Sequence, residues 1–281
     1  MVVGNKWVKT FNTVLLLVFF TIIALTVLYP LVYVVVGAFT PGNSIAGMDV
    51  IPFASGFTLD HFVYLFTRSE YPHWFANTLF IAVLTCAGTL FVASISAYVF
   101  SRFRFTFKKP MLMSLLILQI FPSFVGMIAI YVILYRIGGL NTHWGLILVY
   151  LAGNTPYNIW LVKSYMDSIP KSLDEAARID GASHFKVYRS IILPIAKPIL
   201  VFLTITSFVG PWMDYIFPKM VLRDPSMQTL ALGLFSFVTE RNNDFTNFAA
   251  GALLIAIPFV IFFTITQKML VTSLGGAAVK E

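Results

Sequence analysis

Polar and charged side chains gather in one stretch of this sequence, Ser172 to Pro198, which interrupts an otherwise apolar chain. Ser172 lies three residues before Glu175, the spacing of a capping box, and so predicts a helix that starts at Ser172. Gly181 is expected to end that helix, because glycine readily adopts the left-handed conformation found after helix ends, and Ser183 is expected to cap a second helix. A helix, a corner and a second helix of this kind can bind another surface through non-covalent contacts.

The first predicted helix has one small, apolar side. The residues of that side lie three or four positions apart and are Leu173, Ala176, Ala177 and Asp180. Glu175, Arg178 and Ile179 are expected to project elsewhere. Two adjacent alanines leave room for another surface to come close, although a plain solvated loop helix is the alternative that local sequence leaves open.

The same stretch resembles the E-A-A-x3-G-x9-I-x-L-P loop of the membrane subunits of bacterial ABC importers that depend on a solute-binding protein. The matching residues are Glu175, Ala176, Ala177, Gly181, Ile191, Leu193 and Pro194. In that family the loop is the coupling helix, which docks in a groove of a separate ATPase subunit. The resemblance therefore implies an ATPase-coupling role for Glu175 to Ala177, with Arg178, Asp180 and Gly181 beside them. It also implies that Ile191, Leu193 and Pro194 open the next membrane helix.

Shorter features are similar to the smaller membrane subunit of maltose and maltodextrin importers. They are Leu140 to His143, Leu222 to Asp224, Asp244 with Phe245, Phe248 to Ala250, and the tail Gly275 to Lys280. In that subgroup an outer loop reaches into the sugar site of the docked binding protein, which implies this role for Glu240, Arg241, Asn242, Asn243 and Asp244. The cytoplasmic tail, with Gly275, Gly276 and Lys280, is implied to enter the interface between two ATPase subunits. A solvated turn and a solvated chain end are the alternatives.

Composition places the chain in a membrane. It is 58% hydrophobic and only 11% charged, whereas soluble proteins are typically about 45 to 50% apolar and about 25% charged. The apolar run from Val14 to Ala38 follows Lys6 and Lys9, and it is longer than the core of a signal peptide. We therefore expect an uncleaved membrane helix there. Cys86 is the single cysteine, so an internal disulfide is excluded.

Six apolar stretches are long enough to cross a bilayer, which needs about 20 residues each. They are Phe11 to Ala38, Ala76 to Phe100, Pro110 to Tyr135, Gly145 to Met166, Ile191 to Pro218 and Phe248 to Val271. Prolines within or near the ends of these spans are expected to kink them, as suits a transport pathway. The sequence thus predicts an all-α membrane protein of six transmembrane helices, and the resemblance implies the type I ABC importer permease fold.

Lysine and arginine indicate the orientation. If the N-terminus is cytoplasmic, 14 of the 19 basic residues lie in inner segments and five in outer segments. The positive-inside rule then places both termini and the Ser172 loop in the cytoplasm. This distribution accounts for the net charge of +7, so nucleic-acid binding is not expected.

Signatures of catalysis and of cofactor binding are missing from the sequence. It contains no G-x-x-x-x-G-K-[ST] phosphate loop and no G-x-S-x-G nucleophile motif. The four histidines, His61, His73, His143 and His184, are scattered and do not suggest a metal site. We therefore predict that the chain is not an enzyme and holds no cofactor, and that a partner ATPase binds ATP and Mg.

The spans are nearly free of ionisable side chains, with Asp214 as the chief exception. Proton-driven carriers usually place such groups in the membrane, so a channel or secondary carrier not driven by ATP is the weaker alternative. A membrane scaffold or membrane-embedded enzyme is a further one. Aromatic side chains could line a sugar path, with hydrogen bonds from Gln119, Asn154 and Asn158.

These observations and the resemblance together predict a permease subunit of a binding-protein-dependent ABC importer that carries a maltodextrin-like oligosaccharide. The predicted divisions are a first helix and outer loop (1–75), a permease core (76–275) with the coupling helix at 171–190, and a cytoplasmic tail (276–281). The predicted partners are a second homologous membrane subunit, an ATPase dimer, an extracytoplasmic sugar-binding protein and lipid. The predicted location is a bacterial or archaeal cytoplasmic membrane, crossed several times.

Overall fold

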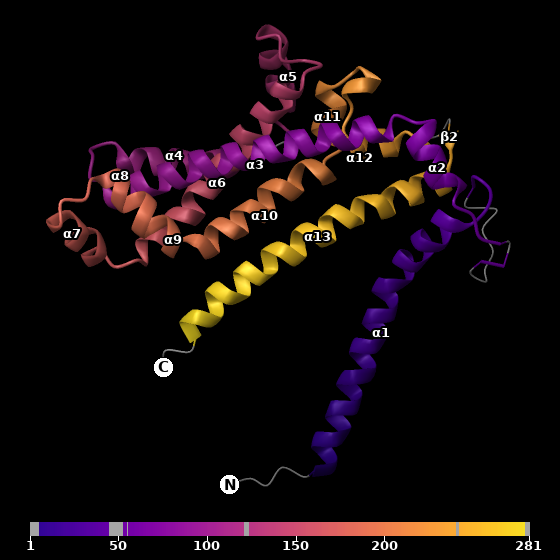
Figure 1. The fold of residues 1–281 in the computed structure, drawn as a ribbon, viewed down its shortest axis with the longest axis horizontal. Helices are drawn as coiled ribbons and strands as arrows, with labels where there is room; N and C mark the ends of the chain where they lie inside the picture. Colours follow the sequence, from indigo (N-terminus) through magenta and orange to yellow (C-terminus); the bar gives the residue numbers. More distant parts are fainter. Residues whose placement is uncertain (1–5, 45–52, 55, 121–123, 240–241, 279–281) are drawn as a thin grey trace. The chain divides into compact units, whose positions relative to one another are not determined.

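The computed structural model describes residues 6–44, 53–54, 56–120, 124–239 and 242–278. The described part is helical except for one short hairpin (Figure 1). It forms two compact units, Met1–Ser69 with Leu234–Ala256, and Glu70–Gly233 with Ile257–Glu281. These units interleave along the chain, whereas the predicted divisions 1–75, 76–275 and 276–281 are consecutive.

The larger unit contains most of the helices. In chain order they are α3 (Tyr71–Arg102), α4 (Lys108–Ile120), α5 (Met127–Arg136), α6 (His143–Asp167), α7 (Ser172–Ile179), α8 (His184–Val187), the π-helical turn η2 (Tyr188–Ile192), α9 (Leu193–Ile195), α10 (Lys197–Met213), α11 (Ile216–Val221) and the 3-10 turn η3 (Pro225–Met227). Helix α12 (Leu230–Phe235) and the long helix α13 (Phe245–Ala278) follow, and parts of both belong to each unit.

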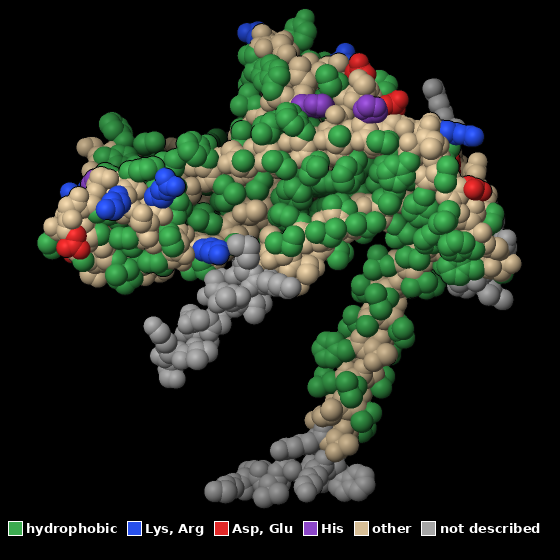
Figure 2. Space-filling view, in the orientation of Figure 1, with side chains coloured by type: hydrophobic (Ala, Val, Ile, Leu, Met, Phe, Trp, Pro, Cys, Tyr) green, Lys and Arg blue, Asp and Glu red, His purple; other side chains and the backbone are tan. Residues whose placement is uncertain are grey.

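Helix α3 is the centre of the larger unit, where it packs against α6 and α10. Its buried face carries small side chains, including Ala82, Cys86, Ala93 and Ala97. These positions are spaced by four or seven residues and so lie on one side of the helix. Small residues let neighbouring backbones approach closely, which is the common way to pack helices in lipid. Figure 2 shows hydrophobic side chains over α3 and α10, with basic side chains gathered at the end that carries α7 and α8.

The predicted fifth span is broken in the structure. The segments His184–Ile195 and Lys197–Met213 meet at a bend of 78°. Pro198 lies in the first turn of α10, where proline is tolerated, whereas within a continuous helix it would remove a hydrogen bond and clash with the preceding turn. The predicted span from Ile191 to Pro218 is therefore not one continuous helix, and α10 ends at Met213.

Three helical segments of the described chain are long and apolar enough to cross a membrane by themselves: Thr10–Phe39, Tyr71–Arg102 and Phe245–Gln267. The bent pair that contains α10 would make a fourth. The predicted third span, Pro110 to Tyr135, corresponds to two shorter helices, α4 and α5, and residues 121–123 between them lie outside the described part.

The smaller unit contains α1 (Lys6–Phe39), α2 (Asp60–Thr67) and a hairpin of β1 (Val238–Thr239) and β2 (Asn242–Asn243). The hairpin is antiparallel, with Val238 opposite Asn243 and Thr239 opposite Asn242. Side chains along most of α1 are exposed and apolar, as expected for a helix whose solvent is lipid. Only its last turns, near Val36 and Ala38, are buried within the unit.

Candidate functional site

Helix α7 ends in a Schellman motif built on Gly181. Gly181 has a φ of +81°, a conformation that L side chains adopt at a cost and glycine does not. Its backbone N–H donates to the carbonyl of Arg178, and the N–H of Ala182 donates to the carbonyl of Ala177. These are the two hydrogen bonds that define the motif. The predicted corner at Gly181 is therefore confirmed.

Helix α7 starts at Ser172 as predicted, but its N-cap differs from the expectation. Lys171 occupies the N-cap position with φ −68° and ψ −21°, and its side chain forms no capping hydrogen bond. Ser172 is already inside the helix, so the predicted cap at Ser172 is wrong. The reason is that the chain turns one residue early, because the N–H of Leu173 donates to the carbonyl of Pro170 and the N–H of Glu175 to that of Lys171.

The second helix starts as expected. Ser183 is the N-cap of α8, and its hydroxyl oxygen accepts a hydrogen bond from the N–H of Lys186 at 3.3 Å. Helix α8 continues through η2 into α9, so Ile191 lies in the π-helical turn and Leu193 and Pro194 lie in α9. These three residues precede the 78° bend. They therefore extend the loop's second helix, and that segment and α10 together are long and apolar enough for one broken span.

The exposed side of α7 and α8 carries large apolar side chains among charged ones. Ile179 is 87% exposed and Phe185 is 67% exposed. Glu175 and Ala176 are exposed as well, while Ala177 is partly buried against the core. We call the exposed residues Leu173, Glu175, Ala176, Ile179 and Phe185 the loop face. Apolar groups exposed within a polar surface typically mark an interaction site.

Neither Ile179 nor Phe185 belongs to the predicted coupling set. Local sequence could have pointed to them, because both are large apolar residues in the most charged stretch of the chain. The set contains Arg178, Asp180 and Gly181, and all three are exposed at the helix end.

A buried ion pair fastens α7 to the membrane helices. Nε of Arg102, the last residue of α3, lies 2.6 Å from Oδ2 of Asp174 in the first turn of α7. The same guanidinium donates through Nη1 to the carbonyl of Met166 at 3.0 Å and through Nη2 to that of Ile169 at 3.0 Å. Arg102 thus joins three segments: the end of α3, the end of α6 and the start of α7.

A second polar contact holds the ends of α3 and α6 together. The Ser101 hydroxyl donates to Oδ1 of Asp167 at 2.7 Å, and Lys163 donates to Oδ2. Burial alone would raise the pKa of Asp167, but the hydrogen bonds from Lys163 and Ser101 and the charges of Lys163 and Lys108 outweigh it. The pKa of Asp167 therefore lies below its usual range, so the carboxylate is ionised at neutral pH.

The second loop helix is attached to α3 through aromatic residues. The Tyr98 hydroxyl donates to the carbonyl of His184 at 3.2 Å, and Ser94 and Tyr188 share a hydrogen bond of 2.8 Å between their hydroxyls. The rings of Tyr98 and Tyr188 are 5.1 Å apart. Both helices of the loop are therefore held by the C-terminal half of α3.

The outer residues predicted to contact a binding protein lie at the hairpin. Asn242 and Asn243 form β2, and Asp244 follows it, while Glu240 and Arg241 lie outside the described residues. The Asp244 carboxylate accepts hydrogen bonds from the N–H and side-chain amide of Asn247, the latter at 2.6 Å. This contact holds the start of α13.

The predicted tail is partly described. Gly275 and Gly276 belong to α13, which continues to Ala278. Lys280 lies outside the described residues.

A cavity of about 870 Å3 opens within the larger unit and is mainly apolar. Gln119 and Asn154, which sequence reasoning assigned to a possible sugar path, both line it. Asp214 lies there too, and its Oδ2 accepts a hydrogen bond from the Tyr150 hydroxyl at 2.9 Å. Asn158 is buried and donates to the carbonyl of Asn154, so the structure does not place it with the lining residues.

In the part of the chain that the structure describes, no three His, Cys, Asp or Glu side chains lie close enough to hold a metal ion.

Comparisons with known proteins agree on one family. Residues 89–275 match the family described as binding-protein-dependent transport system inner membrane component. The chain is 40% identical to the galactooligosaccharides transport system permease protein GanQ of Bacillus subtilis, over 98% of this chain and 97% of that protein. It is 37% identical to the maltodextrin transport system permease protein MdxG of the same organism, over 97% and 98%.

Among solved structures, one chain of a bacterial ABC transporter involved in the import of the acidic polysaccharide alginate has the same fold. The TM-score is 0.78, with 23% sequence identity, and the match covers 95% of this chain and 98% of that chain.

Proposed function

Because the chain belongs to the family of inner membrane components of binding-protein-dependent transport systems, we propose that its solute is a neutral oligosaccharide of the maltodextrin or galactooligosaccharide kind. The chain is a permease subunit of an ABC importer in the inner membrane. It works with a second permease subunit, a solute-binding protein and separate ATPase subunits that hydrolyse ATP. Support for the solute class comes from the names of relatives that match over nearly the full length.

The proposed coupling element is the loop face on α7 and α8. Glu175 would make a charge-assisted contact with a basic side chain of the ATPase groove, while Ala176 lets the groove come close. Ile179 and Phe185 would supply apolar contact area. The observation that carries this proposal is the rigid attachment of α7 behind that face, through Arg102 and Asp174. A docking helix must transmit force to the membrane helices, and a buried ion pair joins it to α3 directly.

The proposed topology has six membrane crossings with both termini in the cytoplasm. In this proposal α1, α3 and α13 would each make one crossing, as their length and apolar composition allow. Helix α6, with 25 residues, would make another. Helices α4 and α5 together would make one broken crossing, and α10 with its neighbours would make another. Broken spans are tolerated in a membrane where they line a cavity or pack against protein. The cavity beside Gln119 and Asn154 is the proposed contribution of this chain to the solute path.

Two further roles are proposed from the resemblance. Glu240 to Asp244 would contact the docked binding protein at the outer surface, supported by the position of Asn243 and Asp244 on and after β2. The tail from Gly275 to Lys280 would reach the ATPase subunits. Its support is the continuation of α13 to Ala278.

The test of the proposed function is purification of the tagged chain from native membranes, followed by reconstitution into liposomes. We expect a second permease subunit and an ATPase to copurify, and uptake of maltotriose or galactotriose to require ATP inside the liposome and the solute-binding protein outside. Uptake by the chain alone without ATP would favour a channel or secondary carrier and would contradict the proposal.

A further inference from the structure

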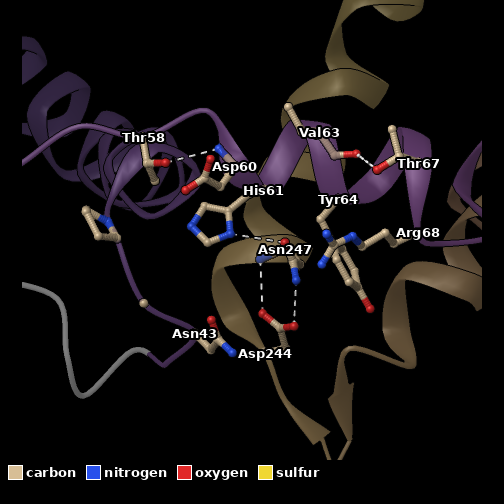
Figure 3. A pocket seen from close by; sticks show the side chains of 12 residues that line it. Asn43, Thr58, Asp60, His61, Val63, Tyr64, Thr67, Arg68, Asp244 and Asn247 are labelled. Atoms are coloured by element: carbon tan, nitrogen blue, oxygen red, sulfur yellow. Dashed lines mark hydrogen bonds between the residues drawn. The ribbon is translucent and has the colours of Figure 1, made fainter.

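The smaller unit contains a polar cavity of about 610 Å3, a size typical of small-molecule sites. It lies between α2, the segment just after α1, and the start of α13, and Figure 3 shows the side chains around it. Of the lining residues, Asp244 alone also belongs to the segment proposed to contact the binding protein.

The base of the cavity is a chain of hydrogen bonds. His61 is only 6% exposed, its Nδ1 lies 3.1 Å from Oδ1 of Asn247, and its Nε2 lies 2.9 Å from the carbonyl oxygen of Thr40. Asn247 in turn donates to Asp244. Both oxygens that face the His61 ring are acceptors, and a neutral imidazole has a single N–H, so His61 donates to one of the two at a time. The Asn247–Asp244 contact holds the other end of the base.

Two charged groups on the walls have no such partners. In the described part of the chain, neither the Asp60 carboxylate nor the Arg68 guanidinium forms a side-chain hydrogen bond or an ion pair. They stand at opposite ends of α2, and Arg68 reaches back toward Tyr64 and Asn247 (Figure 3). Tyr64 lies between them on the same helix and also lines the cavity. A carboxylate, a guanidinium and an aromatic side chain are thus available to a ligand.

We propose that this cavity binds one or two units of a neutral saccharide chain. The Asp60 carboxylate accepts hydrogen bonds from sugar hydroxyls, the Arg68 guanidinium donates to hydroxyl or ring oxygens, and Tyr64 offers an aromatic surface to the apolar face of a sugar ring. The lining carries two carboxylates, Asp60 and Asp244, and one guanidinium, Arg68, so its formal charge disfavours an acidic ligand and favours a neutral one. This inference rests on the proposed function for its ligand class, and it assigns a saccharide site to the smaller unit of this chain.

The helix position of Asp60 has a simpler explanation, since a carboxylate in the first turn of a helix is stabilised by the positive helix end. That explanation does not account for Arg68 at the other end of α2, nor for the polar base between them. A segment of the binding protein is the other possible occupant, and the experiment separates it from a sugar.

The experiment uses the complete importer in lipid nanodiscs, without the binding protein, and measures binding of maltotriose and of galactotriose by saturation-transfer NMR. The variants are Asp60→Asn and Arg68→Gln, each of which removes one charge; Asp60→Asn also keeps the side-chain size. The matched controls are Glu70→Gln and Arg136→Gln, which remove exposed charges outside the cavity. We expect each cavity variant to weaken binding of the better ligand about tenfold, which corresponds to about 1.4 kcal/mol. We expect the controls to match the unmodified complex.

Binding that stays within about twofold in both cavity variants would overturn the inference. Docking is measured afterwards by adding the binding protein to the same nanodiscs. A loss of docking with sugar binding intact would also overturn the inference, because the cavity would then receive protein. Stronger binding of an alginate trisaccharide than of either neutral sugar would overturn the ligand class. ATPase copurification is measured on the same preparations, so failure of the proposed function is seen separately from failure of this site.

Discussion

Arg102 at the end of α3 and Asp174 in the first turn of α7 form an ion pair with Nε 2.6 Å from Oδ2. The two side chains are only 5% and 12% exposed. Separating a buried pair leaves uncompensated charges, which is far more costly than separating an exposed one. Helix α7 and the end of α3 are therefore expected to move as one body when an ATPase pulls on the loop.

The first prediction is that replacing Asp174 by Asn loosens α7. Removing one partner of a buried pair typically costs about 3 to 5 kcal/mol. We expect a lower unfolding temperature of the assembled complex and a loss of binding-protein-stimulated ATP hydrolysis, measured on the same preparation. Arg102→Met should have the same two effects. The double variant should lose less stability than the sum of the losses in the two single variants, because each single change leaves one charge unpaired.

Lys163→Gln is the matched control, because it breaks a neighbouring pair that is less buried, with Lys163 14% and Asp167 42% exposed. Pairs that face solvent contribute about 0 to 1 kcal/mol. Equal losses in Lys163→Gln and Asp174→Asn would mean that burial of the Arg102 pair is not what couples α7 to α3.

The second prediction concerns the backbone of Gly181. A Cβ at this position would meet no atom within 4 Å, so the cost of a side chain comes from the positive φ alone. That cost is about 1 to 2 kcal/mol for most residues and smaller for Asn, which visits this conformation. We expect Gly181→Val to insert normally but lose sugar uptake, and Gly181→Asn to keep most of it. Equal uptake by both variants would show that the corner is not required.

The third prediction concerns the charge of Glu175. If this exposed carboxylate enters the ATPase groove, Glu175→Lys should weaken ATPase binding by about 2 kcal/mol or more, roughly 30-fold. Pull-down of the ATPase with the purified chain measures this directly. A charge reversal in the groove should partly restore binding, and Glu70→Lys, outside the loop, should have no effect. Normal ATPase binding by Glu175→Lys would remove Glu175 from the docking surface.

The fourth prediction concerns topology. In a Cys86→Ala background, a cysteine at Ser183 should be labelled by a membrane-impermeant reagent only from the cytoplasmic side. One at Thr239, an exposed residue of β1, should be labelled only from outside. Labelling of both from the same side contradicts the six-span topology.

The fifth prediction concerns the tail. Deleting Ala277 to Glu281 should reduce ATP hydrolysis stimulated by loaded binding protein and leave assembly intact. Size-exclusion chromatography checks assembly, and phosphate release checks hydrolysis. Full stimulation after the deletion would make the tail a solvated chain end.

Local features of the loop could be predicted because a few neighbouring residues determine them. The corner depends on the φ angle of one residue, Gly181. The second cap depends on the Ser183 hydroxyl, which lies three residues before the N–H that donates to it. Composition likewise predicts a membrane protein, because so few charged residues cannot cover a water-exposed surface. The predicted cap at Ser172 failed for an equally local reason. A capping box needs an extended residue at the N-cap, but the turn that follows Pro170 gives the N-cap residue, Lys171, a helical conformation.

The long-range pairs were decided only by the tertiary structure. Nothing near Arg102 in the sequence indicates Asp174, and nothing near His61 indicates Asn247, because each partner comes from a distant segment. The tertiary structure also decided which side chains are exposed. Ala177 faces the core, and Ile179, two residues later, faces out. A helix pattern gives the spacing of side chains, but which side is covered depends on how α3, α6 and the loop pack, and that packing is the sum of many contacts that no single stretch contains.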